Sequence, residues 1–331
     1  VYHDWGQYDK ALKYYKESLA IARKLGQEGS VATYLNNIGL VYNSRGQYGK
    51  AIKNYEEALD IVRKLGQEGS VGTYLNNIGF VYSSLGKYDK AIKCYEEALA
   101  ILKKLGQEGS VALCLNNIGG VYNSRGQYDK AIKYYEEALA IDRRLGREDG
   151  VAVDLNYIGN VYHSRGQYDK AIMNYEEALA IARKLGQEGS VAFCLNNIGA
   201  VYNSRGQYDR AIKNYEEALA IERKLGQEGS VAFCLNNIGL VYNSRGQYDK
   251  AIKNYEEALA IARKLGQEAD VGIRLNNIGG VYNDWGQYDK AIKYYEEALA
   301  IARKLGREGS VALCLNNIGA VYNSRGQYDR A

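Results

Sequence analysis

A 40-residue period runs through the whole chain and restricts the folds that it can adopt. The segment from Gly206 to Arg245 differs from the segment before it, Gly166 to Arg205, at only four positions. Eight complete copies fill residues 6–325, between a partial copy at 1–5 and another at 326–331. The complete copies begin at Gly6, Gly46, Gly86, Gly126, Gly166, Gly206, Gly246 and Gly286. A fixed period of this size predicts a solenoid, in which each repeat packs on its neighbours.

Each copy has the pattern of two helices. In the first helix apolar residues recur at steps of four, three and four, which places them on one helical face: Val31, Leu35, Ile38 and Tyr42. Ser30 is the expected N-cap, and Gly46 suits the left-handed position that ends a helix.

The second helix is predicted to follow Tyr48 and Gly49 and to end at the glycine at position 66. Its apolar arc is wide enough to contact two neighbours and consists of Ala51, Ile52, Tyr55, Ala58, Leu59, Val62 and Leu65. We expect Gly39, in the middle of the first helix, to let the second helix approach closely through Ala51. The position of Val62 holds Asp142 and Glu222 in two other copies, so we expect the last turn of the second helix to extend beyond the packed region there.

Composition argues against several classes of protein. The 43 Lys and Arg residues nearly balance the 39 Asp and Glu residues, and the two signs alternate, so no basic surface for nucleic acid is expected. No run approaches ~20 apolar residues, so no membrane span is expected. The five cysteines are predicted to be buried or half-buried free thiols, since neighbouring repeats lie too far apart for disulfides. Free thiols and the absence of a visible signal peptide favour a cytoplasmic location, although the chain begins without Met in mid-repeat.

The repeat resembles the tetratricopeptide repeat. LNNIGLVY, with Leu35, Gly39 and Tyr42, matches the family's first-helix signature, and Tyr48, Ala51, Tyr55 and Ala58 match the second helix. The family's proline is missing, and each copy is six residues longer. This longer form is similar to Pins-type polarity adaptors, kinesin light chains and bacterial arrays attached to effector domains.

The resemblance implies an all-α, right-handed superhelical solenoid of antiparallel helix-turn-helix repeats. It also implies a concave groove, lined by the first helices, that binds an extended or helical peptide. The slots of Asn36, Leu40 and Asn43 then line the groove. The predicted groove residues are Asn36, Asn76, Asn116, Asn156, Asn196, Asn236, Asn276, Asn316, Asn43, Asn203, Asn243, Phe193, Phe233, Leu40, Phe80 and Leu240.

Two interpretations of these groove residues remain open. The recurring amide of the Asn36 slot can bond a peptide backbone without reading its side chains, or it can bond only water and neighbouring repeats. The variable apolar residues beside it can be specificity pockets, or the result of drift after recent duplication. The fourth copy is the least regular, with Asp154, Tyr157, Asn160 and His163 as candidates for a local partner contact.

Catalytic, cofactor and metal sites are not indicated. The two histidines, His3 and His163, lie four repeats apart, and no Cys/His set has zinc spacing. Glu56 and Glu57 are consecutive on a helix and point apart. We therefore predict a protein-binding scaffold that is not an enzyme. The alternatives are a structural array that associates end to end with other copies of itself into a filament, and the sensor arm of a longer effector enzyme.

Overall fold

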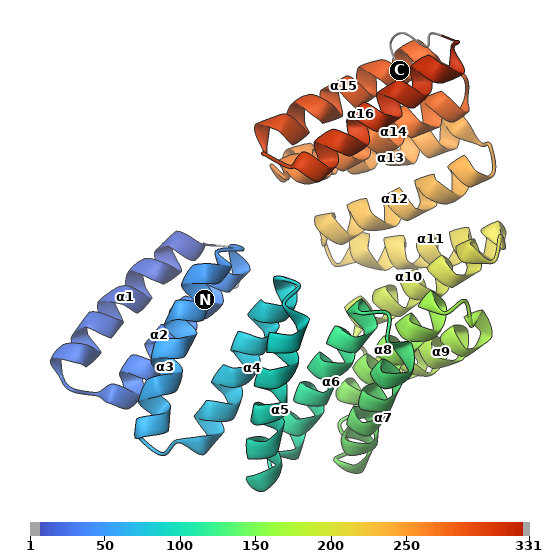
Figure 1. The fold of residues 1–331 in the computed structure, drawn as a ribbon. Helices are drawn as coiled ribbons and strands as arrows, with labels where there is room; N and C mark the ends of the chain where they lie inside the picture. Colours follow the sequence, from blue (N-terminus) through green and yellow to red (C-terminus); the bar gives the residue numbers. More distant parts are fainter. Residues whose placement is uncertain (1–6, 327–331) are drawn as a thin grey trace. The chain divides into compact units, whose positions relative to one another are not determined.

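The computed structural model describes residues 7–326. Within this range the chain forms sixteen α-helices of 17 residues each, and the all-α prediction is confirmed (Figure 1). The chain divides into two compact units after Val161, and the units are described separately.

The first unit runs through seven helices and most of an eighth. Each helix packs against the next along the chain, and helices two apart also touch where both are even-numbered, as α2 and α4 do. The helices are α1 (Tyr8–Lys24), α2 (Glu28–Ser44), α3 (Tyr48–Lys64), α4 (Glu68–Ser84), α5 (Tyr88–Lys104), α6 (Glu108–Ser124), α7 (Tyr128–Arg144) and α8 (Glu148–Ser164).

The second unit repeats the same arrangement, with α10 touching α12 and α14 touching α16. Even-numbered helices correspond to the predicted first helix of each copy, and odd-numbered helices to the second. The helices are α9 (Tyr168–Lys184), α10 (Glu188–Ser204), α11 (Tyr208–Lys224), α12 (Glu228–Ser244), α13 (Tyr248–Lys264), α14 (Glu268–Asp284), α15 (Tyr288–Lys304) and α16 (Glu308–Ser324).

The turns between helices are built around glycines with positive φ. At the end of α2, Gly46 has a φ of 68°; its N–H bonds the Asn43 carbonyl at 2.9 Å, and the N–H of Gln47 bonds the Tyr42 carbonyl at 2.8 Å. These two bonds form a Schellman motif. Gln47 is also the N-cap of α3, so one residue both closes a helix and opens the next.

The same turn corrects the predicted helix start. α2 begins at Glu28, not after Ser30, and its N-cap Gln27 makes no side-chain capping bond. Because Gln27 already closes the turn of α1 by bonding the Ala22 carbonyl, the helix begins two residues before the serine. Glu28 then lies in the first turn, where a negative charge suits the helix dipole.

A buried tyrosine explains the glycine in the middle of each even helix. A Cβ at Gly39 would lie 2.5 Å from Cε1 of Tyr55, a ring with no exposed surface. Gly39 therefore makes room for the Tyr55 ring, not for Ala51 as expected, because the aromatic ring of α3 lies flat against the backbone of α2. Burial raises the pKa of this phenol.

The position of Val62 is buried also in the two copies where it holds a carboxylate. Asp142 and Glu222 are 2% and 7% exposed, so the expectation that the last turn extends past the packed region was wrong. Asp142 is accommodated by a neighbour, since a Cβ on Gly150 would lie 1.9 Å from its Oδ2, and Arg147 lies 3.6 Å from its Oδ1. Burial raises the pKa of both carboxyl groups.

Ion pairs on the surface connect neighbouring repeats. One set joins successive odd helices, as Arg263 of α13 does with Glu297 of α15 at 2.8 Å. A second set joins the end of an even helix to the odd helix before it, as Arg125 does with Asp89 at 2.7 Å.

The cysteines are free thiols. Cys94 is half-buried and the other four are buried, as predicted. Burial raises the pKa of Cys114 to about 12, so this thiol stays protonated.

Candidate functional site

The exposed side of the even helices carries apolar side chains, and we call it the even-helix face. In the second unit one such residue comes from each even helix, at the same slot: Phe193, Phe233, Ile273 and Leu313. Their exposed fractions lie between 46% for Ile273 and 53% for Phe193. In the first unit Leu113 and Val153 occupy the same slot and are 55% and 46% exposed.

A second apolar slot lies seven residues further along the even helices. Phe80 and Leu240 are about as open, with exposed fractions of 50% and 46%. Leu40 differs, since it is half-buried and packs against the core. The position of these exposed residues is that expected for a groove from the helical pattern.

The recurring amides of the Asn36 slot are mostly half-buried and bonded between repeats. The Oδ1 atom of Asn36 accepts a bond from Nδ2 of Asn77 at 2.9 Å, and the same bond joins Asn76 to Asn117. In the second unit it joins Asn236 to Asn277 and Asn276 to Asn317. These bonds agree with the interpretation in which the amides bond neighbouring repeats.

Four members of this slot are placed differently. Asn116 donates to Oδ1 of Asp154 at 2.6 Å. Asn156 and Asn196 are each only 7% exposed and donate to main-chain carbonyls one turn earlier. Asn316 is exposed on the last described helix.

The amides of the Asn43 slot lie at the C-terminal ends of the even helices. Asn43, Asn203 and Asn243 are half-buried. Asn243 donates to Oδ2 of Asp284 at 2.9 Å. The structure therefore brings the predicted amides into rows along the even helices, most of them already bonded within the protein.

The irregular residues of α8 do not form one surface. Asp154 has no exposed surface and lies in the core, whereas Tyr157 is 39% exposed. Tyr157 stacks on Tyr135 with ring centroids 5.2 Å apart. Nε2 of His163 lies 2.9 Å from Oγ of Ser204, and burial lowers the pKa of the imidazole.

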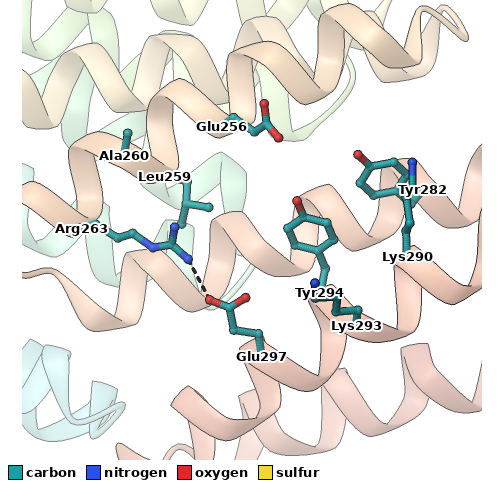
Figure 2. A pocket seen from close by; sticks show the side chains of 9 residues that line it. All are labelled: Glu256, Leu259, Ala260, Arg263, Tyr282, Lys290, Lys293, Tyr294 and Glu297. Carbon is teal, nitrogen blue, oxygen red and sulfur yellow. Dashed lines mark hydrogen bonds and ion pairs between the residues drawn. The ribbon is translucent and has the colours of Figure 1, made fainter.

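A pocket between odd helices is a feature that the sequence did not predict. Figure 2 shows the side chains of α13, the end of α14, and α15 that surround it. Its volume is about 590 Å³. Tyr282 and Tyr294 stack along one side with centroids 5.4 Å apart, and the Arg263–Glu297 ion pair crosses another. A sequence signal existed, because Tyr294 stands where four other copies carry asparagine.

This pocket is lined by aromatic and charged side chains. Nζ of Lys290 lies 5.0 Å from the ring centroid of Tyr282. Burial, and then the charge of Glu256, raises the pKa of Tyr282, and burial also raises that of Tyr294. Both phenols therefore stay neutral and can serve as hydrogen-bonding and stacking groups.

Among residues 7–326 no three His, Cys, Asp or Glu side chains are grouped so as to hold a metal ion. No helix in the described part of the chain is both long and apolar enough to cross a membrane.

Comparison of the sequence with protein families gives one result. The tetratricopeptide repeat model matches residues 1–64, 30–104, 70–144, 110–184, 190–264 and 270–331. A search of curated proteins finds no match.

Three solved structures illustrate the similarity of fold. BtubC (BKLC) from P. vanneervenii is 27% identical, with a TM-score of 0.59 over 66% of this chain and 92% of that one. A Podosopora anserina kinesin light chain with nearly identical TPR-like repeats is 21% identical, with a TM-score of 0.50 over 58% and 95%. A Rap protein complexed with competence and sporulation factor is 15% identical, with a TM-score of 0.56 over 98% and 99%.

Proposed function

Because this chain belongs to the tetratricopeptide repeat family, we propose that it is a non-catalytic scaffold that holds a peptide segment of another protein on its even-helix face. The observation that carries this proposal is the column of exposed apolar side chains in the second unit. Four successive even helices each present one aliphatic or aromatic residue at the same slot, about half exposed. Covering such a column stabilises a complex, since fully burying a side chain of this size contributes ~1.5–3 kcal/mol.

The distribution of charge indicates what kind of segment fits. The helices α10, α12 and α16 each carry a single charged residue, the glutamate at their first position, whereas α14 carries Glu268, Asp270, Arg274 and Asp284. The odd helices carry the lysines, arginines and glutamates that form the ion pairs. A partner for the even-helix face is therefore an uncharged segment with apolar anchors, whereas the odd-helix side favours solvent.

The side-chain amides of the even-helix face are the groups that would bond the backbone of the peptide. The side-chain carbonyls of Asn36, Asn76, Asn236 and Asn276 are each bonded to the next even helix, as in Asn236 with Asn277 at 2.8 Å. Such a bond fixes the orientation of the amide before a ligand arrives, so that less side-chain entropy is lost on binding. The NH₂ groups and carbonyl oxygens have the chemistry to bond a peptide backbone beside the apolar anchors.

The similarity to solved structures supports the proposal at the level of fold. The Rap protein was solved in complex with competence and sporulation factor, so a repeat array of this shape is able to hold a partner molecule. The similarity does not extend to the chemistry of that partner.

The experiment is a selection of random peptides on the full chain, followed by binding measurements on variants. We expect selected peptides to bind at least about tenfold more weakly to Phe193→Ser/Phe233→Ser, which corresponds to ~1.4 kcal/mol. Lys213→Ser, an exposed change on the odd helix α11, is the matched control and should leave the affinity unchanged. Equal effects of the two variants would overturn the proposal.

A further inference from the structure

A small cavity lies beneath the even-helix face, where α14, α15 and α16 meet. Its volume is about 140 Å³. Ile273 of α14 and Leu313 of α16 line it, and both are about half exposed, so the mouth lies between them. Its base consists of Ala298 and Ala302 of α15 and Cys314 of α16, which are 4% exposed or less.

One pair of residues explains why the cavity is there. In each copy, a residue early in the even helix faces a residue late in the odd helix that follows, 30 positions further along. In the second copy this pair is Gly72 and Leu102, and a Cβ on Gly72 would lie 3.0 Å from Cγ of Leu102. The leucine therefore fills the space that the glycine leaves.

The seventh copy has the glycine without the leucine. The pair there is Gly272 and Ala302, the smallest of the seven pairs from 32/62 to 272/302. A Cβ on Gly272 would meet its nearest neighbour, Cγ2 of Ile301, only at 3.5 Å, which is ordinary contact. Gly72 is buried, whereas Gly272 is half-buried. The missing leucine thus leaves an opening from the surface into the space between the helices.

Two polar atoms of the amides that line the cavity are already bonded to the protein. Oδ1 of Asn276 accepts from Asn317 at 2.9 Å, and Nδ2 of Asn277 donates to Asn236 at 2.8 Å. Ser310 and the exposed Arg307 line the rim. A polar ligand would find few free hydrogen-bonding groups inside the cavity. An apolar ligand would exclude water from its apolar lining. Apolar cavities of about this volume, ~150 Å³, stay dry and take up benzene or xenon.

We propose that this cavity binds one uncharged apolar group of about the size of benzene or a leucine side chain. Two sources can supply the group: a free small apolar molecule, or one side chain of a bound polypeptide. The second source rests on the function proposed above, and the first does not.

The test uses benzene as the probe and exchanges the filling residue between the two copies. In the full chain, benzene should shift the methyl NMR signals of Ile273 and Leu313 and raise the melting temperature, with one equivalent bound. Ala302→Leu reproduces the native Gly72–Leu102 pair and should abolish both effects. Leu102→Ala reproduces the Gly272–Ala302 pair and should add a second binding site in α4 and α5.

Circular dichroism shows whether each variant is folded. If Ala302→Leu does not fold, Ala302→Val tests the same filling with a smaller side chain. The absence of any benzene effect on the unaltered chain would overturn the proposal, and so would an effect of equal size in the filled variant.

A peptide arm separates the two sources of the apolar group. Peptides selected on the unaltered chain are compared for binding to Ala302→Leu and to Phe193→Ser/Phe233→Ser. Weaker binding to the filled variant indicates that a peptide side chain enters the cavity. If only Phe193→Ser/Phe233→Ser weakens peptide binding while benzene still binds, the cavity binds free apolar molecules. If no peptide depends on the even-helix face but benzene binds, the proposed function fails and the cavity proposal stands.

Discussion

Two adjacent glycines in α6 should respond differently to the same substitution. A Cβ added at Gly119 would lie 2.7, 2.9 and 3.0 Å from Cε1, Cδ1 and Cζ of Tyr135. A Cβ added at Gly120 would meet only the Tyr135 hydroxyl, at 3.7 Å. Tyr135 is 3% exposed, so its ring has no solvent-filled space into which it can move.

The magnitude follows from two opposing contributions. Alanine is favoured over glycine inside a helix by ~0.8–1 kcal/mol, and this gain applies equally to both positions. Forcing an extra methyl group into a packed core costs ~1–3 kcal/mol, and this cost applies only at position 119. We expect Gly120→Ala to raise the free energy of unfolding by ~1 kcal/mol. The free energy of unfolding of Gly119→Ala should be ~1–3 kcal/mol lower than that of Gly120→Ala.

The measurement is urea unfolding followed by circular dichroism, fitted as a sum of repeat and interface terms because long arrays depart from two-state behaviour. Gly279 and Gly280 in α14 have the same geometry against Tyr295 and provide an independent replicate. In a Tyr135→Ala background the difference between the two glycine variants should vanish. Equal effects at positions 119 and 120 with Tyr135 intact would show that the Tyr135 ring is not the reason for a glycine at position 119.

Three further predictions concern charge and reactivity. Burial raises the pKa of Asp154 from its ordinary 3.8 to about 7, so the folded chain binds the proton more tightly than the unfolded chain. The stability should therefore fall as pH rises from about 4 to about 7. Asp154→Asn should reduce this dependence in urea unfolding at different pH values, and an unchanged slope would contradict it. The exposed Arg223–Glu257 pair should contribute only ~0–1 kcal/mol, so a double-mutant cycle giving several kcal/mol would refute its assignment as a surface pair. Cys94, which is half-buried, should react with a thiol reagent before Cys114, which is fully buried, and the reverse order in mass spectrometry would contradict the burial.

The repeat pattern predicted the helices well because every copy has the same spacing of apolar residues and glycines. The apolar steps of Val31, Leu35 and Ile38 correctly identified the packed face, since all three are 6% exposed or less. The glycine at 46 correctly ended its helix. The prediction of Ser30 as the N-cap was wrong, because a single residue, Gln27, both ends one helix and precedes the next.

The errors in side-chain placement have a common cause. A helical wheel shows which residues share a face but not what lies opposite them. Gly39 was paired with Ala51 although the Tyr55 ring lies against it, and Asp142 was expected outside although it is buried beside Gly150. The second case had a signal in the sequence, since Gly150 replaces a serine in the same copy that gains Asp142. The predicted amides and apolar residues lie on the even helices, but Asn156 and Asn196 are buried and Leu40 packs against the core. The bonds between amides depend on distances between repeats, which the sequence does not contain.

The pattern of compensation among the copies bears on whether their differences arose by drift alone. Where α4 loses a methyl group at Gly72, α5 has Leu102 opposite; where α7 gains Asp142, α8 loses a side chain at Gly150. Such paired changes are expected when packing is maintained, because both voids and excess volume in a core are destabilising. Gly272 with Ala302 has no such compensation, and it lies directly beneath the exposed Ile273 and Leu313. A cavity closed off inside the core only loses packing contacts. A cavity that opens at a binding face can regain those contacts from a bound ligand. The location of this exception therefore favours a cavity kept for a ligand over one left by chance.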